Sequence, residues 1–338
     1  MRLGVEGKLG EDVSGGLFLA TGSLGDNPTG TNQTLSEFFT RRAVGLDRGW
    51  VTYNPTQAKW IELTGGKFAF TWNRTSLTFD SDLNPEGFSQ KFTFKPKKGA
   101  LKALSVTGLQ LLFNEVAAPG GGSFAANDSF AVGGQVSGSF DLGNRVSTTV
   151  SGLALNWQNA DPIATAMATR VLRSNLLTNA TVGTGANTRF LSQFLYVDVI
   201  ADNTIRTGSD RWPVRFLFEY LNNPRARTDE NQAVFLETSL GRLQKHKDYQ
   251  FGYSFARVEQ DAVLAAFNES EFRAPTNILQ HRAFFQWMVQ KNTTAIFTGW
   301  LGHTLDRNLQ NAAVPPTLPG QSQDPYVKKL QMDVIYKF

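Results

Sequence analysis

The stretch YVKKLQMDVIYKF, residues 326–338, decides the fold class because its side chains alternate in character. The apolar members share one parity: Leu330, Met332, Val334, Tyr336 and Phe338. The polar members share the other: Lys329, Gln331, Asp333 and Lys337. Successive side chains of a β-strand point to opposite faces, so this pattern predicts a strand with one apolar and one polar face. An amphipathic strand that runs to the last residue is unusual for a domain terminus.

The same alternation recurs in earlier segments. It is clear in DSFAVGGQVSGSFDLG (128–143), WPVRFLFEY (212–220) and KDYQFGYSFARVE (247–259). Soluble strands usually have about 5–6 residues, whereas membrane-spanning strands need about 9–11. The lengths and the aromatic-rich apolar faces therefore predict a transmembrane antiparallel β-barrel, with lipid outside and water inside.

Composition narrows the choice further. The 338 residues are 41% hydrophobic, and no run approaches the roughly 18 apolar residues of a transmembrane helix. The net charge of +4 is too small to indicate a nucleic-acid partner. The chain has 0 Cys and 3 His, without metal-ligand spacing, GxSxG or HExxH. We therefore expect no enzymatic activity, no metal and no cofactor.

The chain reads as about fifteen strands in a single barrel domain, residues 1–338. We predict strands at 1–9, 14–23, 44–54, 58–67, 86–95, 101–113, 129–142, 145–157, 190–201, 212–222, 232–241, 247–259, 278–290, 293–304 and 326–338. Short and long links alternate between them, and the link 158–189 contains a candidate short helix. Because bacterial barrels have even strand numbers, we expect a sixteenth strand before Met1. A secretory leader and any periplasmic module would also precede that residue.

Several short sequence motifs, which follow one another in the same order, resemble the putative porin family of Gram-negative outer membranes. They are LGVEGKLGEDVSGGLFLATGS (3–23), NPTGTNQTL (27–35), GLDRGWVTYNP (45–55), TGGKF (64–68), FDSDLNPEGFS (79–89), LYVDVIADNTI (195–205), WPVRFLFEYLNN (212–223) and DAVLAAFNESEF (261–272). The resemblance implies a sixteen-stranded barrel, multi-pass in the bacterial outer membrane, that acts as a diffusion channel. It further implies that the third long loop, about 68–85, folds inward and constricts the pore. The resemblance also implies that the insertion machinery of that membrane recognises the C-terminal Phe338.

The two-residue period then assigns candidate pore-lining residues. The inward parity selects Arg48, Trp50, Lys91, Arg215, Glu219 and Arg282. The loop contributes an acidic side through Asp80, Asp82 and Glu86. Basic wall residues facing an acidic loop would create a transverse field that filters small solutes by charge. The alternative is that these are ordinary solvated charges, with Asp47 and Arg48 forming a local ion pair.

Two interpretations of the aromatic residues remain open. Several of them, among them Trp60, Trp212, Trp300 and Tyr336, lie near predicted strand ends, as in the girdles of membrane barrels. The other interpretation makes Trp50 and Trp72 a stacking track for sugars in the lumen.

Two functions also remain open. The first is a porin for passive diffusion of small hydrophilic solutes and ions, and the second is an anchor or tether for a missing periplasmic module. For partners we expect outer-membrane lipid and lipopolysaccharide, small solutes and no nucleic acid. We also expect a homotrimer, latched by the early strands and the loop at 24–43.

Overall fold

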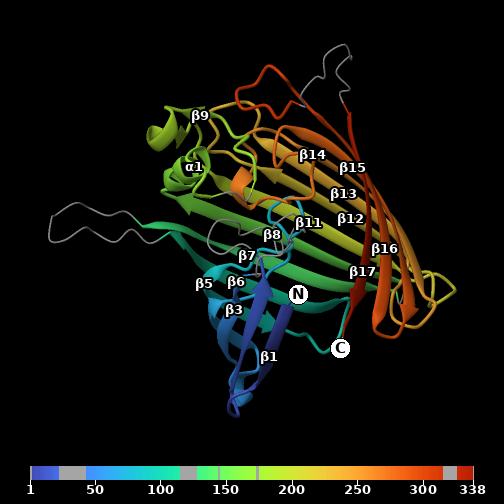
Figure 1. Ribbon diagram of the computed structural model, residues 1–338. Helices are drawn as coiled ribbons and strands as arrows, with labels where there is room; N and C mark the ends of the chain where they lie inside the picture. Colours follow the sequence, from blue (N-terminus) through green and yellow to red (C-terminus); the bar gives the residue numbers. More distant parts are fainter. Residues whose placement is uncertain are drawn as a thin grey trace.

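Fifteen strands form one antiparallel sheet, in which each strand pairs with the next one along the chain (Figure 1). The structure is a computed structural model that describes residues 2–22, 43–114, 128–143, 145–172, 175–314 and 326–337. The strong curvature of the sheet makes an incomplete barrel. The predicted all-β, antiparallel barrel fold is confirmed.

The strands of the sheet are β1 (Arg2–Lys8), β2 (Val13–Thr21), β3 (Val44–Tyr53), β4 (Ile61–Lys67), β5 (Glu86–Phe94), β6 (Leu101–Asn114), β7 (Ser129–Leu142), β8 (Val146–Gln158), β11 (Leu195–Ile205), β12 (Val214–Asn222), β13 (Gln232–Gly241), β14 (Tyr249–Val258), β15 (Ile278–Gln290), β16 (Thr293–Thr304) and β17 (Tyr326–Tyr336). Between β8 and β11 lie the helix α1 (Asp161–Ala168), the two-residue strands β9 (Thr181–Val182) and β10 (Arg189–Phe190), and the 3-10 turn η2 (Gly185–Asn187). Two further 3-10 turns are η1 (Thr56–Ala58) and η3 (Ala265–Phe267).

Most strand bounds agree with the sequence prediction to within three residues, and α1 lies in the segment expected to form a short helix. The largest error concerns β11, which was expected at 190–201 and spans Leu195–Ile205. Phe190 belongs instead to the small β9–β10 ladder, and Phe194 is fully buried among loops. Asp202, Asn203 and Thr204 lie beyond the expected end of the strand, and the structure pairs them in the ladder with β12.

The two edges of the sheet are β1 and β17, and no ladder joins them among the described residues. In a consecutive antiparallel order of fifteen strands, the first and last run in the same direction. An antiparallel ladder therefore cannot join these two edges directly. The expected strand before Met1 lies outside this sequence and stays a prediction. Among the described residues, no helix is long and apolar enough to cross a membrane.

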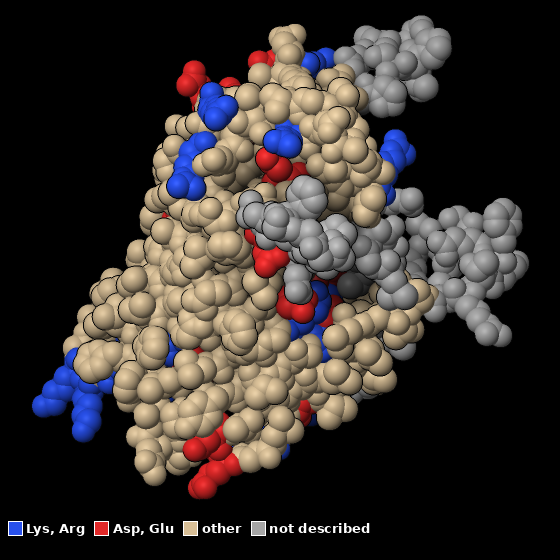
Figure 2. All heavy atoms as spheres, turned by 90° about the vertical axis from the view of Figure 1, so that its left-hand side faces the viewer, with Lys and Arg blue, Asp and Glu red and all other residues tan. Residues whose placement is uncertain are grey.

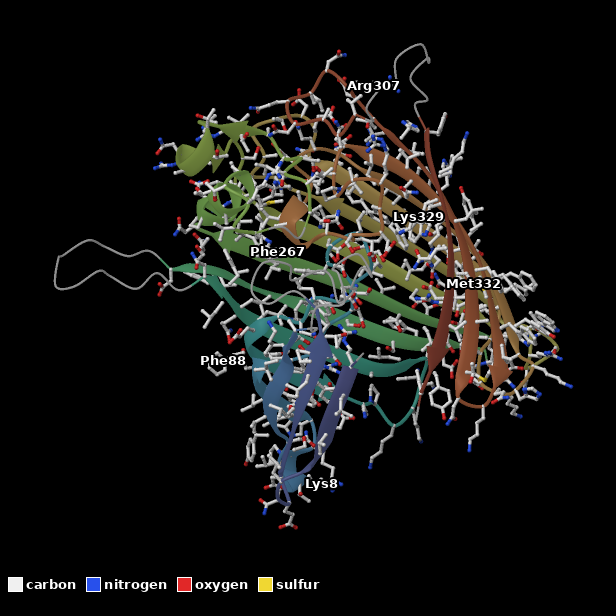
Figure 3. The ribbon with its side chains drawn as sticks, in the orientation of Figure 1. Lys8, Phe88, Phe267, Arg307, Lys329 and Met332 are labelled. Atoms are coloured by element: carbon white, nitrogen blue, oxygen red, sulfur yellow. The ribbon has the colours of Figure 1, made fainter. Side chains whose placement is uncertain are left out.

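The outer face of the sheet is apolar. Exposed outward side chains include Val5, Leu17, Val51, Phe88, Phe92, Val136, Phe216, Phe251, Phe297, Leu330 and Met332. The face in Figure 2 shows a broad uncharged surface with charged groups mainly at its upper and lower margins. In Figure 3, Lys8 marks the short-turn end of the sheet and Arg307 the long-loop end. This distribution is typical of a wall that spans lipid.

A β-bulge in β3 places the side chain of Asp47 on the inner face of the sheet. The β2–β3 register shifts between Phe18 and Leu19, which face Arg48 and Leu46, so Asp47 is the extra residue. Asp47 and Arg48 therefore both lie on the inner face, while Leu46 and Val51 are exposed on the outer face. In the sequence, the apolar–polar alternation loses phase near Leu104 and Val146, which predicts bulges at these two positions. A shift does occur between Leu101 and Ala103, but the ladders of Val146 are regular.

The inner face differs between its two ends. Near the short turns it carries polar residues such as Ser147, Thr149 and Asp202. Near the long loops it is apolar and buried, with Leu109, Leu111, Leu153, Leu155, Trp157, Tyr196, Leu217, Leu221, Phe235 and Val258 in one hydrophobic cluster. Loops that fold into the barrel cover the apolar part of the inner face near the long loops. Phe267 of one such loop lies within the curve of the sheet in Figure 3.

Candidate functional site

The loop 68–85 between β4 and β5 crosses the interior and binds the inner face of distant strands. The backbone N–H of Asn73 donates to Gln135 Oε1 at 2.8 Å. Its side-chain amide donates to Ser137 Oγ at 2.9 Å and Ser151 Oγ at 2.6 Å. Thr75 donates its hydroxyl to Glu219 of β12. Contacts to β7, β8 and β12 from a loop that begins at β4 place it inside the barrel.

The aromatic residues of this loop stabilise its inward position. Phe68, Trp72 and Phe79 are almost completely buried. Phe79 has its ring centroid 6.2 Å from that of Trp157 on β8 and 6.3 Å from that of Tyr196 on β11. Burial of side chains of this size contributes about 1.5–3 kcal/mol each. Trp72 is 5% exposed and packs edge-on against Phe70 and Phe79, so it offers little surface for stacking a sugar.

A second loop, residues 259–277, also lies inside the barrel, and the sequence analysis did not predict it. Asp80 donates its backbone N–H to Phe267 O at 2.8 Å, and Ser270 N donates to Asp80 Oδ2 at 2.7 Å. Leu264 N donates to the hydroxyl oxygen of the fully buried Tyr196 at 2.8 Å. The segment AVLAAF, residues 262–267, was the available signal, because a loop exposed to water rarely carries such an apolar run.

A buried carboxylate connects this second loop to others. Asp261 is fully buried and accepts hydrogen bonds from Ala180 N, Ser192 Oγ and Thr228 Oγ1 at 3.0, 2.7 and 3.2 Å. These donors come from the segments after β8 and β12. Burial raises the pKa of Asp261. The inward loops are therefore held together by polar contacts as well as by the apolar cluster.

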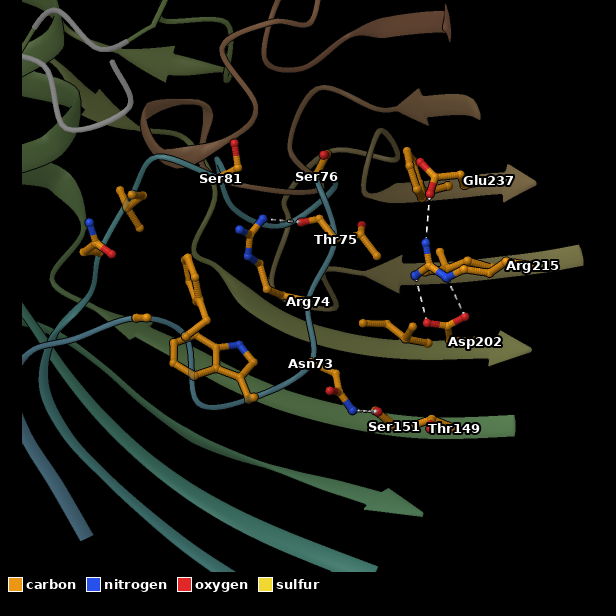
Figure 4. Close-up of a pocket in the computed structure, with 18 of the residues that line it drawn as sticks. Asn73, Arg74, Thr75, Ser76, Ser81, Thr149, Ser151, Asp202, Arg215 and Glu237 are labelled. Carbon is orange, nitrogen blue, oxygen red and sulfur yellow. Dashed lines mark hydrogen bonds and ion pairs between the residues drawn. The ribbon is translucent and has the colours of Figure 1, made fainter. Parts of the chain in front are cut away.

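Below the loop 68–85, toward the short turns, the structure leaves a cavity of about 670 Å³. Figure 4 shows its two sides, with Asn73, Thr75 and Ser76 of the loop opposite Asp202, Arg215 and Glu237 of the wall. Arg74 also lines the cavity, but its guanidinium turns away from Arg215, donates to Phe79 O at 2.9 Å and lies 4.4 Å from the Phe70 ring centroid. In Figure 2 acidic and basic side chains lie together at a hollow in the surface.

Four charged residues of the wall form a row of ion pairs. Arg215 of β12 donates to both carboxylate oxygens of Asp202 on β11, at 2.9 and 2.8 Å. It also donates to Glu237 Oε1 on β13 at 3.0 Å. Arg282 of β15 donates to Glu237 Oε2 at 3.1 Å. We call Asp202, Arg215, Glu237 and Arg282 the charge row.

The opposite part of the cavity is formed by β1 and β3. Arg48 has its guanidinium 4.0 Å from the Phe18 ring centroid and 3.8 Å from Asp47 Oδ2. Arg2 pairs with Asp47 at 3.2 Å and with Asp82 at 3.3 Å. Each of these cations thus has a carboxylate close by, and the Asp47–Arg48 contact expected from the sequence is present.

Three further residues that the sequence predicted to line the pore also lie on the inner face, but outside these ion pairs. Trp50 has its ring across Gly16, where an added Cβ would be 2.2 Å from the ring. Lys91 donates to Thr71 O at 3.2 Å. Glu219 is on the inner face but fully covered by the loop, so it does not contact an open passage.

The predicted acidic side of the loop requires correction. Asp80 is 1% exposed and bound by the amides of Ser270 and Asp82, so it does not face Arg48 or Lys91. Glu86 is exposed and shares the outward parity of Phe88. Of the three predicted acidic residues, only Asp82 forms an ion pair with a described cation of the wall, which is Arg2. Asp80 and Glu86 therefore do not form the predicted acidic side, and the wall cations Arg215 and Arg282 have Glu237 of the wall as their partner.

The predicted position of Trp300 also requires correction. Expected in an outer girdle, it pairs in register with Arg282 on the inner face, and the Arg282 guanidinium lies 5.4 Å from its ring centroid. Trp60 and Tyr336, by contrast, are 55% and 61% exposed near the short-turn end.

Several ionisable side chains of the inward loops have shifted pKa values. Burial raises the pKa of Asp80. Burial, with a further contribution from the charge of Asp80, raises the pKa of Glu269 to about 7. Burial lowers the pKa of Arg74, against the opposing charges of Glu269, Asp80 and Glu219. Across the described part of the chain, no group of three or more His, Cys, Asp or Glu is placed to hold a metal ion.

Solved structures with a similar arrangement are outer-membrane proteins. Wzi of Escherichia coli, described as an outer-membrane protein involved in group 1 capsule assembly and a carbohydrate-binding β-barrel, matches with a TM-score of 0.50 and 10% identity, over 99% of this chain and 78% of its own. OmpT of Vibrio cholerae matches with 0.48 and 8%, over 99% and 88%. The outer-membrane channel DcaP of Acinetobacter baumannii matches with 0.47 and 13%, over 99% and 84%. At such identities the likeness to Wzi concerns the fold alone. No curated protein matches the chain.

The family comparison is decisive. Residues 1–185, more than half of the chain, match the model of the family described as Putative porin. This segment contains β1 to β8, the inward loop 68–85 and α1. The chain therefore belongs to the putative porin family, and it is a channel-forming β-barrel of the bacterial outer membrane.

Proposed function

We propose that this porin lets small hydrophilic solutes and ions diffuse through the cavity beneath the loop 68–85, and that this loop sets the narrowest part of the channel. The observation that carries the proposal is the row of hydrogen bonds from Asn73 and Thr75 to β7, β8 and β12. A loop tied to the opposite wall reduces the cross-section available to water. The loop 259–277 supports it from the long-loop side.

The residues proposed to line the passage are Arg48, Trp50, Lys91, Arg215 and Arg282, together with Asp82. Their support is their position on the inner face or beside Arg2, as described above. Asp80 and Glu219 are assigned to holding the loop in place instead. Passive diffusion needs no catalytic group, and the porin family supports a role other than catalysis.

The proposed partners are outer-membrane lipid and lipopolysaccharide, and a homotrimer is the proposed assembly. The apolar outer face supports contact with lipid. The segment 24–43, predicted to latch a trimer, lies almost wholly outside the described residues. Mild detergent extraction should give a heat-sensitive trimer band on an unheated gel, and a monomer would count against the assembly.

The loop can be tested with disulfides, because the chain has 0 Cys. Replacing Asn73 and Ser151 by Cys should lock the loop to β8, since Asn73 Nδ2 and Ser151 Oγ lie 2.6 Å apart. In planar bilayers we expect the locked channel to conduct like the wild type. A variant in which residues 73–81 are replaced by a short Gly-Ser linker should conduct more.

Two outcomes would contradict the proposal. If the linker variant folds, by heat-modifiable gel mobility, yet conducts like the wild type, the loop does not constrict the channel. If wild type and linker variant both fail to conduct, the barrel has no open passage, and the anchor hypothesis gains support.

A further inference from the structure

The charge row has an arrangement that restricts what the channel can accept. Its four members come from β11, β12, β13 and β15, and all lie on the inner face. In register, Ser254 of β14 lies between Glu237 and Arg282. The row contains two carboxylates and two guanidinium groups, so it has no net charge. Asp202, Arg215 and Glu237 line the cavity, and Arg282 lies beside it through its bond to Glu237.

Glu237 has a distinct position within the row. Its two carboxylate oxygens accept from different cations, Arg215 at 3.0 Å and Arg282 at 3.1 Å. Its side chain is 16% exposed, against 38% for Arg215 and 25% for Arg282. Hydrogen bonds between charged groups are stronger than neutral ones, and partial burial limits screening by salt. Removing this one negative charge would leave both arginines with less compensation.

Among the described residues, the other charged side chains that line the cavity are Arg2, Arg48 and Arg74. Arg2 and Arg48 face Asp47 and Asp82, and the guanidinium of Arg74 turns into the loop. A solute with a single charge would lose part of its hydration here without meeting a net opposite charge. A solute that carries both charges can place its anionic end near an arginine and its cationic end near Asp202 or Glu237.

We propose that the cavity favours small zwitterionic solutes of the amino-acid type, and that Glu237 is the residue that determines this specificity. The inference rests on the proposed diffusion function. Asp202 compensates Arg215 alone, whereas Glu237 compensates two cations, so Glu237 controls the sign of the charge that a solute encounters.

The first test measures ion selectivity by reversal potential under a KCl gradient. The wild type should show a reversal potential near zero. Glu237→Gln should favour chloride over potassium by roughly tenfold, because two guanidinium groups lose their shared partner. Arg282→Gln should shift the potential toward potassium. Opposite shifts from two members of one row cannot arise from a general loss of structure.

The matched control is Asp141→Asn. Asp141 pairs with Arg206 at 3.3 Å near the short turns, and neither residue lines the cavity. This variant also removes one carboxylate from an arginine pair, and it should leave the reversal potential unchanged. A shift equal to that of Glu237→Gln would show that the effect is not specific to the row and would overturn the proposal.

The second test measures uptake into proteoliposomes of three probes of similar size: alanine, lactate and 1-amino-2-propanol. Wild-type channels should take up alanine fastest, and Glu237→Gln channels should take up lactate fastest. Uptake of all three probes without preference would overturn the zwitterion specificity and leave the diffusion function standing. Uptake no faster than in empty liposomes would overturn the diffusion function itself, and with it this inference.

Discussion

The two ends of the lumen are built from the same strands and the same parity, yet they have opposite chemistry. On the inner face of β8, Thr149 near the short turns borders an open cavity, whereas Leu153 and Leu155 near the long loops are almost completely buried. The outward neighbours of those leucines are Ala154 and Asn156, so at this level the larger apolar side chains lie on the inner face. Alternation thus identifies the face of a residue, but it does not identify what that face contacts.

The difference follows from what fills the barrel at each level. At the long-loop end, the loops 68–85 and 259–277 replace water with aromatic and aliphatic side chains. At the short-turn end, connections as short as the one at 291–292 cannot fold back, and the wall keeps water and paired charges. The predictions below test this contrast, in order of expected effect.

The largest effect is expected from Leu155→Ala. Leu155 is 0% exposed in the apolar cluster, so this change should lower the free energy of unfolding by about 2–5 kcal/mol. Thr149→Ala is the matched change on the same face at the polar level and should cost less than about 1.5 kcal/mol. The temperature at which the folded gel band converts to the unfolded one measures both. Equal costs would mean that the two levels are packed alike.

A smaller effect is expected from Asp261→Asn. The carboxylate accepts three hydrogen bonds, and an amide nitrogen would face donors at one of those positions. We expect the inward loops to weaken by about 1–3 kcal/mol while the barrel stays folded. Limited proteolysis should then cleave within 259–277 faster than in the wild type. Asp306→Asn, a change in another long loop, is the control, and equal cleavage of all three proteins would contradict the role of Asp261.

The inward loops should also respond to pH. The folded pKa of Glu269 is raised to about 7, and that of Asp80 is raised as well, so folding favours their protonated forms. The resulting stability is fully present below the ordinary carboxyl pKa and is lost as pH rises toward 7. The neighbouring charged groups are Glu271, Arg74 and Arg282, of which the arginines reduce the effect.

Hydrogen exchange of the Ser270 amide measures this response, because that amide donates to Asp80. After correction for intrinsic exchange rates, we expect roughly tenfold more protection at pH 5 than at pH 8, equivalent to about 1.4 kcal/mol. Glu269→Gln should show much less dependence. Protection that increases with pH would reverse the sign and contradict the argument.

The smallest effect concerns the polar level, where Gly16 lies beneath Trp50. A methyl group at Gly16 would meet the ring at 2.2 Å, so Gly16→Ala should cost about 1 kcal/mol as the ring moves. Gly49→Ala is the matched control, since its nearest neighbour lies at 3.6 Å. The same gel measurement applies. If both variants unfold at the wild-type temperature, the ring adjusts without cost and does not depend on this glycine.

Much of the barrel could be predicted because two-residue alternation is local. It located the strands and put Arg215 and Arg282 on the inner face, since a one-residue slip would expose them to lipid at about 2–4 kcal/mol each. The resemblance to porins predicted that the loop 68–85 lies inside. Its aromatic residues supported this, because Phe68, Trp72 and Phe79 together are costly in water.

The electrostatics of the site could not be predicted in the same way. Asp80 was expected to face Arg48, but its partners are the amides of Ser270 and Asp82, and Ser270 lies 190 residues away. Glu237 was not recognised at all, because nothing in its own strand indicates that Arg215 and Arg282 converge on it from either side. Strand parity gives each side chain a face, whereas ion pairing depends on the neighbours of that strand in the sheet.

The sequence by itself determined the strand pattern, the apolar outer wall and the membership in a porin family, because each depends on short-range order along the chain. Only the tertiary structure decided that two loops fill one end of the lumen and that Arg215 and Arg282 of the wall pair with Glu237 of the wall. Such properties depend on contacts between segments that the sheet and loops bring together across more than a hundred residues, as from Thr75 to Glu219. Hydrogen bonds and ion pairs act over a few ångströms in space, and separation along the chain does not limit them.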